Sequence, residues 1–88
     1  MKEYFVYILK SNLDYYYIGQ TNNLKDRLRR HNSQQSTYTR NKGNWEVVIS
    51  KKVQTRHEAV NLEFKLKKMK NSLKAIEYLI NFSESIPT

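Results

Sequence analysis

Five side chains in this sequence are of types that together can cut a phosphodiester bond. They are two phenols, a guanidinium, an imidazole and a carboxylate: Tyr7, Tyr17, Arg27, His31 and Glu63. A carboxylate can hold a divalent metal ion, which neutralises charge on a phosphate and on its leaving oxygen. Arginine offers a fixed fork of donors to phosphate oxygens, and a phenol or imidazole can take a proton from water. Magnesium needs only one or two protein carboxylates, so a single glutamate is enough.

Two strands are expected to carry the phenols. Residues 4–9 are aromatic and β-branched, with apolar side chains on both faces, which predicts a central strand. A short turn and a second strand over residues 15–20 follow, so the two strands should form an antiparallel hairpin. Because side chains alternate across a strand, both phenols project from one face if Tyr7 pairs with Tyr17 or with Gly19.

A helix is expected to carry the guanidinium and the imidazole. Asn23 can cap this helix, which should end near His31. Arg27 and His31 lie four residues apart and therefore share a face, which is also the face of two leucines, Leu24 and Leu28. The polar pair should thus point toward the body of the protein.

The carboxylate is expected on a second helix, after a polar surface loop over residues 32–44 and a third strand over residues 45–52. Thr55 and Glu58 match a capping box, in which Thr caps the helix and Glu reaches back. Glu63 falls on the apolar side of the helix. A buried carboxylate is costly when it is unpaired, so Glu63 needs a cation or a metal ion beside it.

A last helix completes the predicted architecture. Ser72 is expected to cap it, and its inward-facing residues should be Leu73, Ile76, Leu79 and Ile80. The predicted order is β-β-α-β-α-α, an α+β domain whose small three-stranded antiparallel or mixed sheet is flanked by three helices. Residues 1–82 should form this single domain, followed by a flexible tail over residues 83–88.

The composition favours a polyanionic partner. The 88 residues include 16 Lys and Arg against eight Asp and Glu, which gives a formal net charge of +8. A small basic domain suits nucleic acid or a membrane surface, but the longest apolar run is far too short to cross a bilayer. Cysteine is absent, which excludes thiolate metal sites and agrees with a cytoplasmic protein. A domain of this size should bind its substrate in a shallow groove.

Each candidate also has a structural interpretation. The tyrosines can be ordinary strand aromatics, because strands favour them and this chain has seven. Arg27 can pair with a surface acid, and His31 can be a cation at a helix C-terminus. Glu63 can pair with Lys67 four residues later. A run of lysines such as the one around Glu63 is usually a solvated helix face. Because this run flanks Glu63, we expect Lys67 and Lys70 to contact phosphates.

Several segments together carry a family resemblance. They are Phe5-Val6-Tyr7, Tyr17-Ile18-Gly19-Gln20-Thr21, residues 23–28, His31, and Glu58-Ala59 followed by Glu63. Over residues 4–81 this set resembles the GIY-YIG nuclease superfamily, and most of all its small stand-alone bacterial members, the YhbQ-like proteins. The first motif has Phe-Val in place of Gly-Ile, which keeps the strand character and the phenol.

The resemblance implies a three-stranded antiparallel sheet and single-step hydrolysis of a DNA strand with one divalent metal ion, Mg²⁺ or Mn²⁺. Glu63 would hold this ion. Tyr7 or Tyr17 would position or deprotonate the attacking water, and Arg27 would stabilise phosphate charge. His31 occupies a position that some restriction enzymes of the family use in the site.

The resemblance extends to the polar loop. Tyr38-Thr39-Arg40 resembles a Lys-Tyr-Thr-Arg stretch of the small members, with Thr37 in place of the lysine, and Arg40 is therefore expected to contact nucleic acid. Gln20 stands where some members have a lysine near the reaction. The stand-alone members also lack a separate DNA-reading domain, which leaves target choice open, does not exclude RNA, and suggests a partner protein that supplies specificity.

Two other functions compete with the nuclease. The net charge of +8 alone would suit a nucleic-acid-binding module without useful catalysis, which acts with a partner. It would also suit an adaptor that docks on an acidic protein. The nuclease leads, because charge alone does not require Arg27, His31 and Glu63 to face inward.

Overall fold

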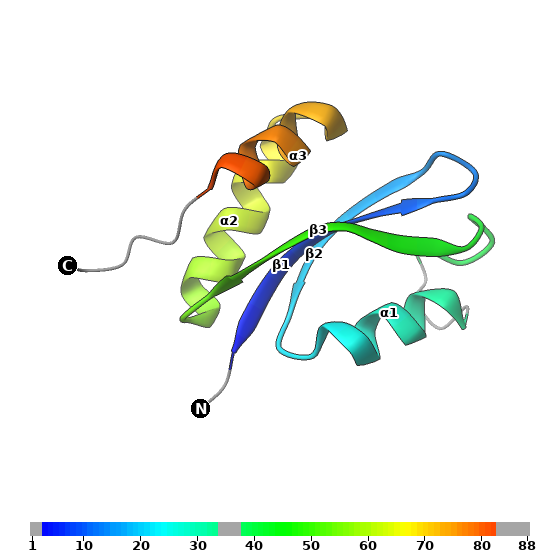
Figure 1. Ribbon diagram of the computed structural model, residues 1–88, viewed down its shortest axis with the longest axis horizontal. Coiled ribbons are helices and arrows are strands. Elements are labelled where there is room, and N and C mark those ends of the chain that lie inside the picture. Colours follow the sequence, from blue (N-terminus) through cyan, green and yellow to red (C-terminus); the bar gives the residue numbers. More distant parts are fainter. Residues whose placement is uncertain (1–2, 34–37, 83–88) are drawn as a thin grey trace.

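The computed structural model describes residues 3–33 and 38–82 (Figure 1). Its elements are β1 (Tyr4–Ser11), β2 (Tyr16–Thr21), α1 (Leu24–Asn32), β3 (Trp45–Val53), α2 (Arg56–Lys68) and α3 (Ser72–Asn81). The predicted α+β architecture and its element order are confirmed. The predicted flexible tail over residues 83–88 lies outside the described residues. None of the helices in the described part of the chain is long and apolar enough to cross a membrane.

The three strands form one antiparallel sheet in the order β2-β1-β3. The central strand is β1, as its two-sided apolar pattern predicts, and residues 6–9 of it are fully buried. Across the hairpin Tyr7 pairs with Gly19, and Tyr17 pairs with Leu9. This is one of the two predicted registers, so both phenols project from the same face.

Helices cover both faces of the sheet: α1 lies on one face, and α2 and α3 lie on the other (Figure 1). Strand alternation therefore divides the core in two. The cluster under α2 and α3 contains Val6, Ile8, Val53, Ala59, Leu62, Leu66, Ala75 and Leu79. The cluster under α1 contains Tyr7, Leu9 and Trp45, with Tyr17, Leu24, Leu28 and Val47 packed against it.

Side-chain caps begin all three helices. The Asn23 side chain accepts a hydrogen bond from the backbone N–H of Asp26, as predicted for α1. Thr55 caps α2, and its hydroxyl donates to the Glu58 carboxylate at 3.3 Å. The predicted cap of α3 is wrong by one residue: Asn71 is the cap, and Ser72 is the first helical residue.

The inward face of α3 also differs from its prediction. Leu73 and Ile80 are 70% and 58% exposed, whereas Ala75 and Leu79 are fully buried. Ala75 and Leu79 lie four residues apart and form the stripe that meets the sheet. Leu73 precedes Ala75 by about half a turn and therefore points away from it. The apolar periodicity of α3 was compatible with more than one face, and packing selects one of them.

Candidate active site

Gly19 lets the Tyr7 ring cross β2. A Cβ atom on Gly19 would lie only 2.6 Å from Tyr7 Oη and 2.9 Å from Tyr17 Cε2. Any side chain at this position would therefore displace one of the two phenols. The bare backbone of Gly19 allows the buried Tyr7 side chain to extend over β2, which is an edge strand of the sheet.

The two phenols belong to a row of rings at this edge. The ring centroids of Tyr7 and Tyr17 are 6.1 Å apart. The Tyr17 ring in turn lies 4.7 Å from the His31 ring and 5.5 Å from the Tyr38 ring. Tyr17 thus connects the buried pair of Tyr7 and His31 to Tyr38, which is 56% exposed.

His31 is fully buried at the end of α1, and both of its ring nitrogens have partners. Its Nε2 lies 3.2 Å from Tyr7 Oη, and its Nδ1 lies 2.9 Å from Thr39 Oγ1. Burial lowers the pKa of the imidazole, and the nearby charge of Arg27 lowers it further. A neutral imidazole follows, which does not fit the alternative of a cation at the helix C-terminus.

The charges of Arg27 on α1 and Glu63 on α2 both influence the Tyr7 phenol. Burial is the main cause that raises the pKa of the Tyr7 phenol. The neighbouring Tyr17 and the Glu63 carboxylate also raise this pKa, whereas the Arg27 guanidinium lowers it. A cation on α1 and a carboxylate on α2 therefore both act electrostatically on one buried phenol.

Glu63 forms an ion pair with Lys67, in which Glu63 Oε2 and Lys67 Nζ are 2.7 Å apart. The Glu63 side chain is 20% exposed, whereas that of Lys67 is 54% exposed. The hydrogen bond to Glu63 raises the pKa of Lys67, and Tyr17 and Tyr38 act on this pKa in the same direction. The predicted alternative partner of Glu63 is therefore present, and it lies beside the two tyrosines.

Thr39 is a buried member of the site that the sequence alone does not single out as a partner of His31. Its backbone carbonyl accepts a hydrogen bond from Trp45 Nε1 at 3.3 Å. Trp45 is held in turn by Asn32, which accepts from the Trp45 N–H and donates to the Trp45 carbonyl. This network fixes the turn around Thr39 against α1. A lone threonine in a polar loop has no periodic pattern that would predict its burial.

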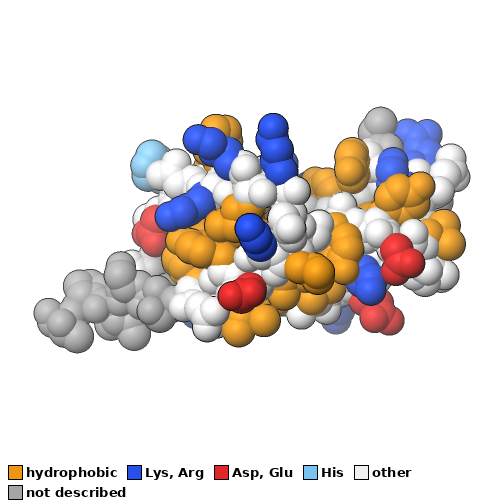
Figure 2. Space-filling model, turned by 90° about the horizontal axis from the view of Figure 1, so that it is seen from above, with side chains coloured by type: hydrophobic (Ala, Val, Ile, Leu, Met, Phe, Trp, Pro, Cys, Tyr) orange, Lys and Arg blue, Asp and Glu red, His pale blue; other side chains and the backbone are white. Residues whose placement is uncertain are grey.

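A cavity of about 490 Å³ opens beside the row of rings. The lining residues come from β2, from the turn at Tyr38 and from the junction of α2 and α3: Tyr16, Tyr17, Ile18, Tyr38, Leu66, Lys67, Lys70, Asn71 and Ser72. Two of the three predicted nucleic-acid contacts, Lys67 and Lys70, thus line one cavity. The third, Arg40, is exposed two residues after Tyr38. Over α2 and α3, Figure 2 shows basic side chains that project around hydrophobic ones.

The side chains that could act as metal ligands limit the kind of metal ion that this site could hold. Within residues 3–33 and 38–82, no group of three or more His, Asp and Glu side chains converges on one point. Glu63 would therefore be the protein carboxylate, and its partly buried position beside the phenols suits that role. One carboxylate with waters and phosphate oxygens fits a magnesium-like ion, whereas structural zinc takes four protein ligands.

Comparison with known proteins identifies the family. Residues 3–77 match the model of the GIY-YIG catalytic domain. The chain is 36% identical over 80 residues to UPF0213 protein OB0043 of Oceanobacillus iheyensis, with 88% of this chain and 93% of the relative covered. It is 35% identical over 71 residues to UPF0213 protein CPE1444 of Clostridium perfringens, with 80% and 76% covered. The solution NMR structure of UPF0213 protein BH0048 from Bacillus halodurans has a TM-score of 0.54 and 26% identity, with 94% of this chain and 87% of that chain covered. The chain therefore belongs to the GIY-YIG family, whose domain is of nuclease type, together with the small bacterial UPF0213 proteins.

Proposed function

We propose that this protein is an endonuclease that hydrolyses DNA phosphodiester bonds with one divalent metal ion, Mg²⁺ or Mn²⁺. The observation that carries the proposal is the Tyr7–His31 hydrogen bond, which is fully buried and lies beside the charges of Arg27 and Glu63. A set of surface contacts to a polyanion would not require Tyr7 and His31 to be buried. Their polar groups are costly to bury, and a catalytic role explains why these two side chains are buried together.

In this proposal Glu63 holds the metal ion. When bound, such an ion neutralises charge on the scissile phosphate and on the leaving oxygen. Arg27 donates hydrogen bonds to the phosphate oxygens, for which its planar guanidinium is suited. Lys67 is paired with Glu63 at 2.7 Å and, if Glu63 held the ion, would be available to contact a phosphate instead.

The buried rings would move the proton. The raised pKa of Tyr7 keeps its hydroxyl protonated, so its O–H donates to His31 Nε2. The neutral imidazole carries a single ring proton, which we assign to Nδ1, so that Nδ1–H donates to Thr39 Oγ1. Tyr17 lines the cavity and would orient the attacking water. As the water attacks, the Tyr7 oxygen would take a proton from it while Tyr7 passes its own hydroxyl proton to His31 Nε2, so that the neutral imidazole becomes an imidazolium.

Cleavage of supercoiled plasmid and of branched DNA, with Mg²⁺ or Mn²⁺, tests this function. Wild-type protein should cut in a metal-dependent manner, and Glu63→Ala should lose the activity and keep its fold. Glu58→Ala is the matched control, because Glu58 lies on the same helix and its side chain serves the helix cap. Equal activity in wild type and Glu63→Ala would contradict the proposal.

A nucleic-acid-binding module without catalysis is the second candidate, and the Glu63–Lys67 ion pair favours it, because the carboxylate already has a cation as partner. If this candidate is correct, neither wild type nor Glu63→Ala cuts DNA, and both bind DNA with an affinity that falls steeply as the salt concentration is raised. Affinity that does not change with salt would exclude it.

A further inference from the structure

The cavity beside the candidate site has two chemically different sides. Tyr16, Ile18 and Leu66 contribute apolar lining, and Tyr17 contributes an aromatic ring from the edge strand β2. Lys67 and Lys70 supply positive charge. Aromatic and apolar lining next to cations suits a nucleotide, which has a flat base and an anionic phosphate.

Tyr38 is an exposed aromatic residue that lines this cavity. Its ring is 56% exposed and lies 5.5 Å from the ring of Tyr17, centroid to centroid. Lys42 Nζ lies 4.6 Å from the centroid of the Tyr38 ring, and the same amine donates to the Tyr38 carbonyl. Binding a ligand to a mobile side chain costs conformational entropy. The contacts with Tyr17 and Lys42 restrict the Tyr38 ring before a ligand binds, so this cost is smaller.

The cavity is directly connected to the candidate site. Tyr17 belongs to both, and Lys67 lines the cavity while it contacts Glu63 at 2.7 Å. A phosphate bound by Arg27 and by a metal ion on Glu63 would therefore lie next to the cavity, which could then receive the adjoining nucleotide. In a B-form duplex a base offers only its edges to a protein, because its faces are stacked on other bases. Only an unpaired or extruded base can present a face to Tyr17 and Tyr38.

We propose that this cavity is a subsite for an unpaired nucleobase next to the scissile phosphate, so that the substrate is single-stranded DNA or DNA with an unpaired nucleotide. The inference rests on the proposed nuclease function for the position of the phosphate. The contact with the base depends only on the cavity and its rings.

Binding of an oligonucleotide that contains 2-aminopurine tests the subsite, because the fluorescence of this base is quenched when it stacks on an aromatic ring. The Glu63→Gln variant is used to prevent cleavage, and moderate salt weakens contacts made only to phosphates. The same strand is compared alone and in a full duplex. We expect tighter binding of the single strand, with quenching, and little quenching in the duplex beyond that of the free duplex.

Tyr38→Ala, added to Glu63→Gln, should weaken single-strand binding by about 5- to 150-fold, since one base stacked on an aromatic side chain contributes about 1–3 kcal/mol. Tyr38→Phe should retain the affinity, because it keeps the ring. Phe64→Ala is the matched control: Phe64 is an aromatic residue 63% exposed on α2 that does not line this cavity.

The results of these binding experiments test the nucleobase subsite independently of the nuclease activity. Equal affinity for single strand and duplex, or no effect of Tyr38→Ala, would overturn the subsite even if the wild type cuts DNA. Tyr38-dependent quenching without metal-dependent cutting by the wild type would support the subsite and overturn the catalytic function.

Discussion

Replacement of Thr39 by valine tests whether a hydroxyl group outside the predicted set positions His31. Valine has a shape close to that of threonine but cannot form the 2.9 Å contact with His31 Nδ1. Both residues are fully buried, so bulk water cannot take the place of the lost partner. The nitrogen is then left without a hydrogen bond inside the protein.

The expected loss of stability follows from this burial. A buried polar group without a partner costs about 1–3 kcal/mol. For a domain of this size each kcal/mol lowers the melting temperature by about 4–8 °C, so Thr39→Val should melt about 4–24 °C below wild type. Thr39→Ser should melt closer to wild type, because it keeps the hydroxyl and loses only a methyl group.

Nitrogen NMR reports the tautomer of the His31 imidazole, which a general loss of packing would not change. In wild type and Thr39→Ser we expect the proton on Nδ1, and in Thr39→Val we expect a change in the tautomer of His31. The cleavage rate of Thr39→Val should fall together with this change. A variant that melts like wild type and keeps the wild-type tautomer would refute the positioning role of Thr39.

Three further predictions concern neighbouring groups. The pKa of His31 is lowered from its ordinary value of 6.5, so wild type should lose stability as the pH falls below about 6.5 toward the lower folded-state pKa, and pH-dependent melting of His31→Phe should lack this loss. Gly19→Ala should lower stability by about 1–3 kcal/mol in denaturant titrations and impair cleavage, because its Cβ would lie 2.6 Å from Tyr7 Oη; unchanged values would contradict the close approach. Lys67→Met should raise Mn²⁺ affinity up to about fivefold in calorimetric titrations, since an ion pair that is open to solvent on the lysine side contributes about 0–1 kcal/mol, and should weaken DNA binding. Weaker Mn²⁺ binding in Lys67→Met would show that the ion pair does not compete with the metal.

The central hairpin could be predicted because two independent signals agree. The two-sided apolar run in residues 4–9 identifies a buried central strand, and the short turn and second strand that follow it predict the hairpin. The sequence left two registers open, and the structure selects the one in which Gly19 gives Tyr7 room. The inward polar positions Arg27 and Glu63 were also predictable, because each interrupts an apolar helix face. In these cases the local pattern and the tertiary structure favour the same arrangement.

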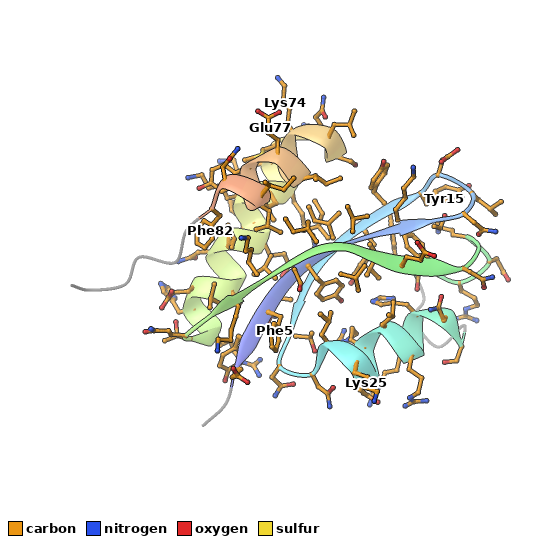
Figure 3. All side chains as sticks on the ribbon, viewed as in Figure 1. Phe5, Tyr15, Lys25, Lys74, Glu77 and Phe82 are labelled. Carbon is orange, nitrogen blue, oxygen red and sulfur yellow. The ribbon has the colours of Figure 1, made fainter. Side chains whose placement is uncertain are left out.

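The buried face of α3 and the position of Thr39 could not be predicted, because they depend on contacts between segments that are distant in the sequence. The apolar residues of α3 spread around much of the helix, so only packing against the sheet decides that Ala75 is buried and Leu73 is exposed. Figure 3 shows Lys74 and Glu77 on the side of α3 that points away from the sheet. Thr39 is buried because Trp45 and His31 bind it from other elements, and neither contact leaves a periodic signal in the loop.

The most direct test of the central claim is the rate at which purified wild-type protein nicks supercoiled plasmid with Mg²⁺, with EDTA, and after replacement of Glu63 by glutamine. Glutamine keeps the size of the side chain and removes its charge, so a matching circular dichroism spectrum and melting temperature would verify the fold. We predict nicking that EDTA abolishes and that Glu63→Gln slows by at least about 100-fold, since the metal ion contributes several kcal/mol. Nicking at the wild-type rate by a folded Glu63→Gln variant, or nicking that persists in EDTA, would contradict this prediction.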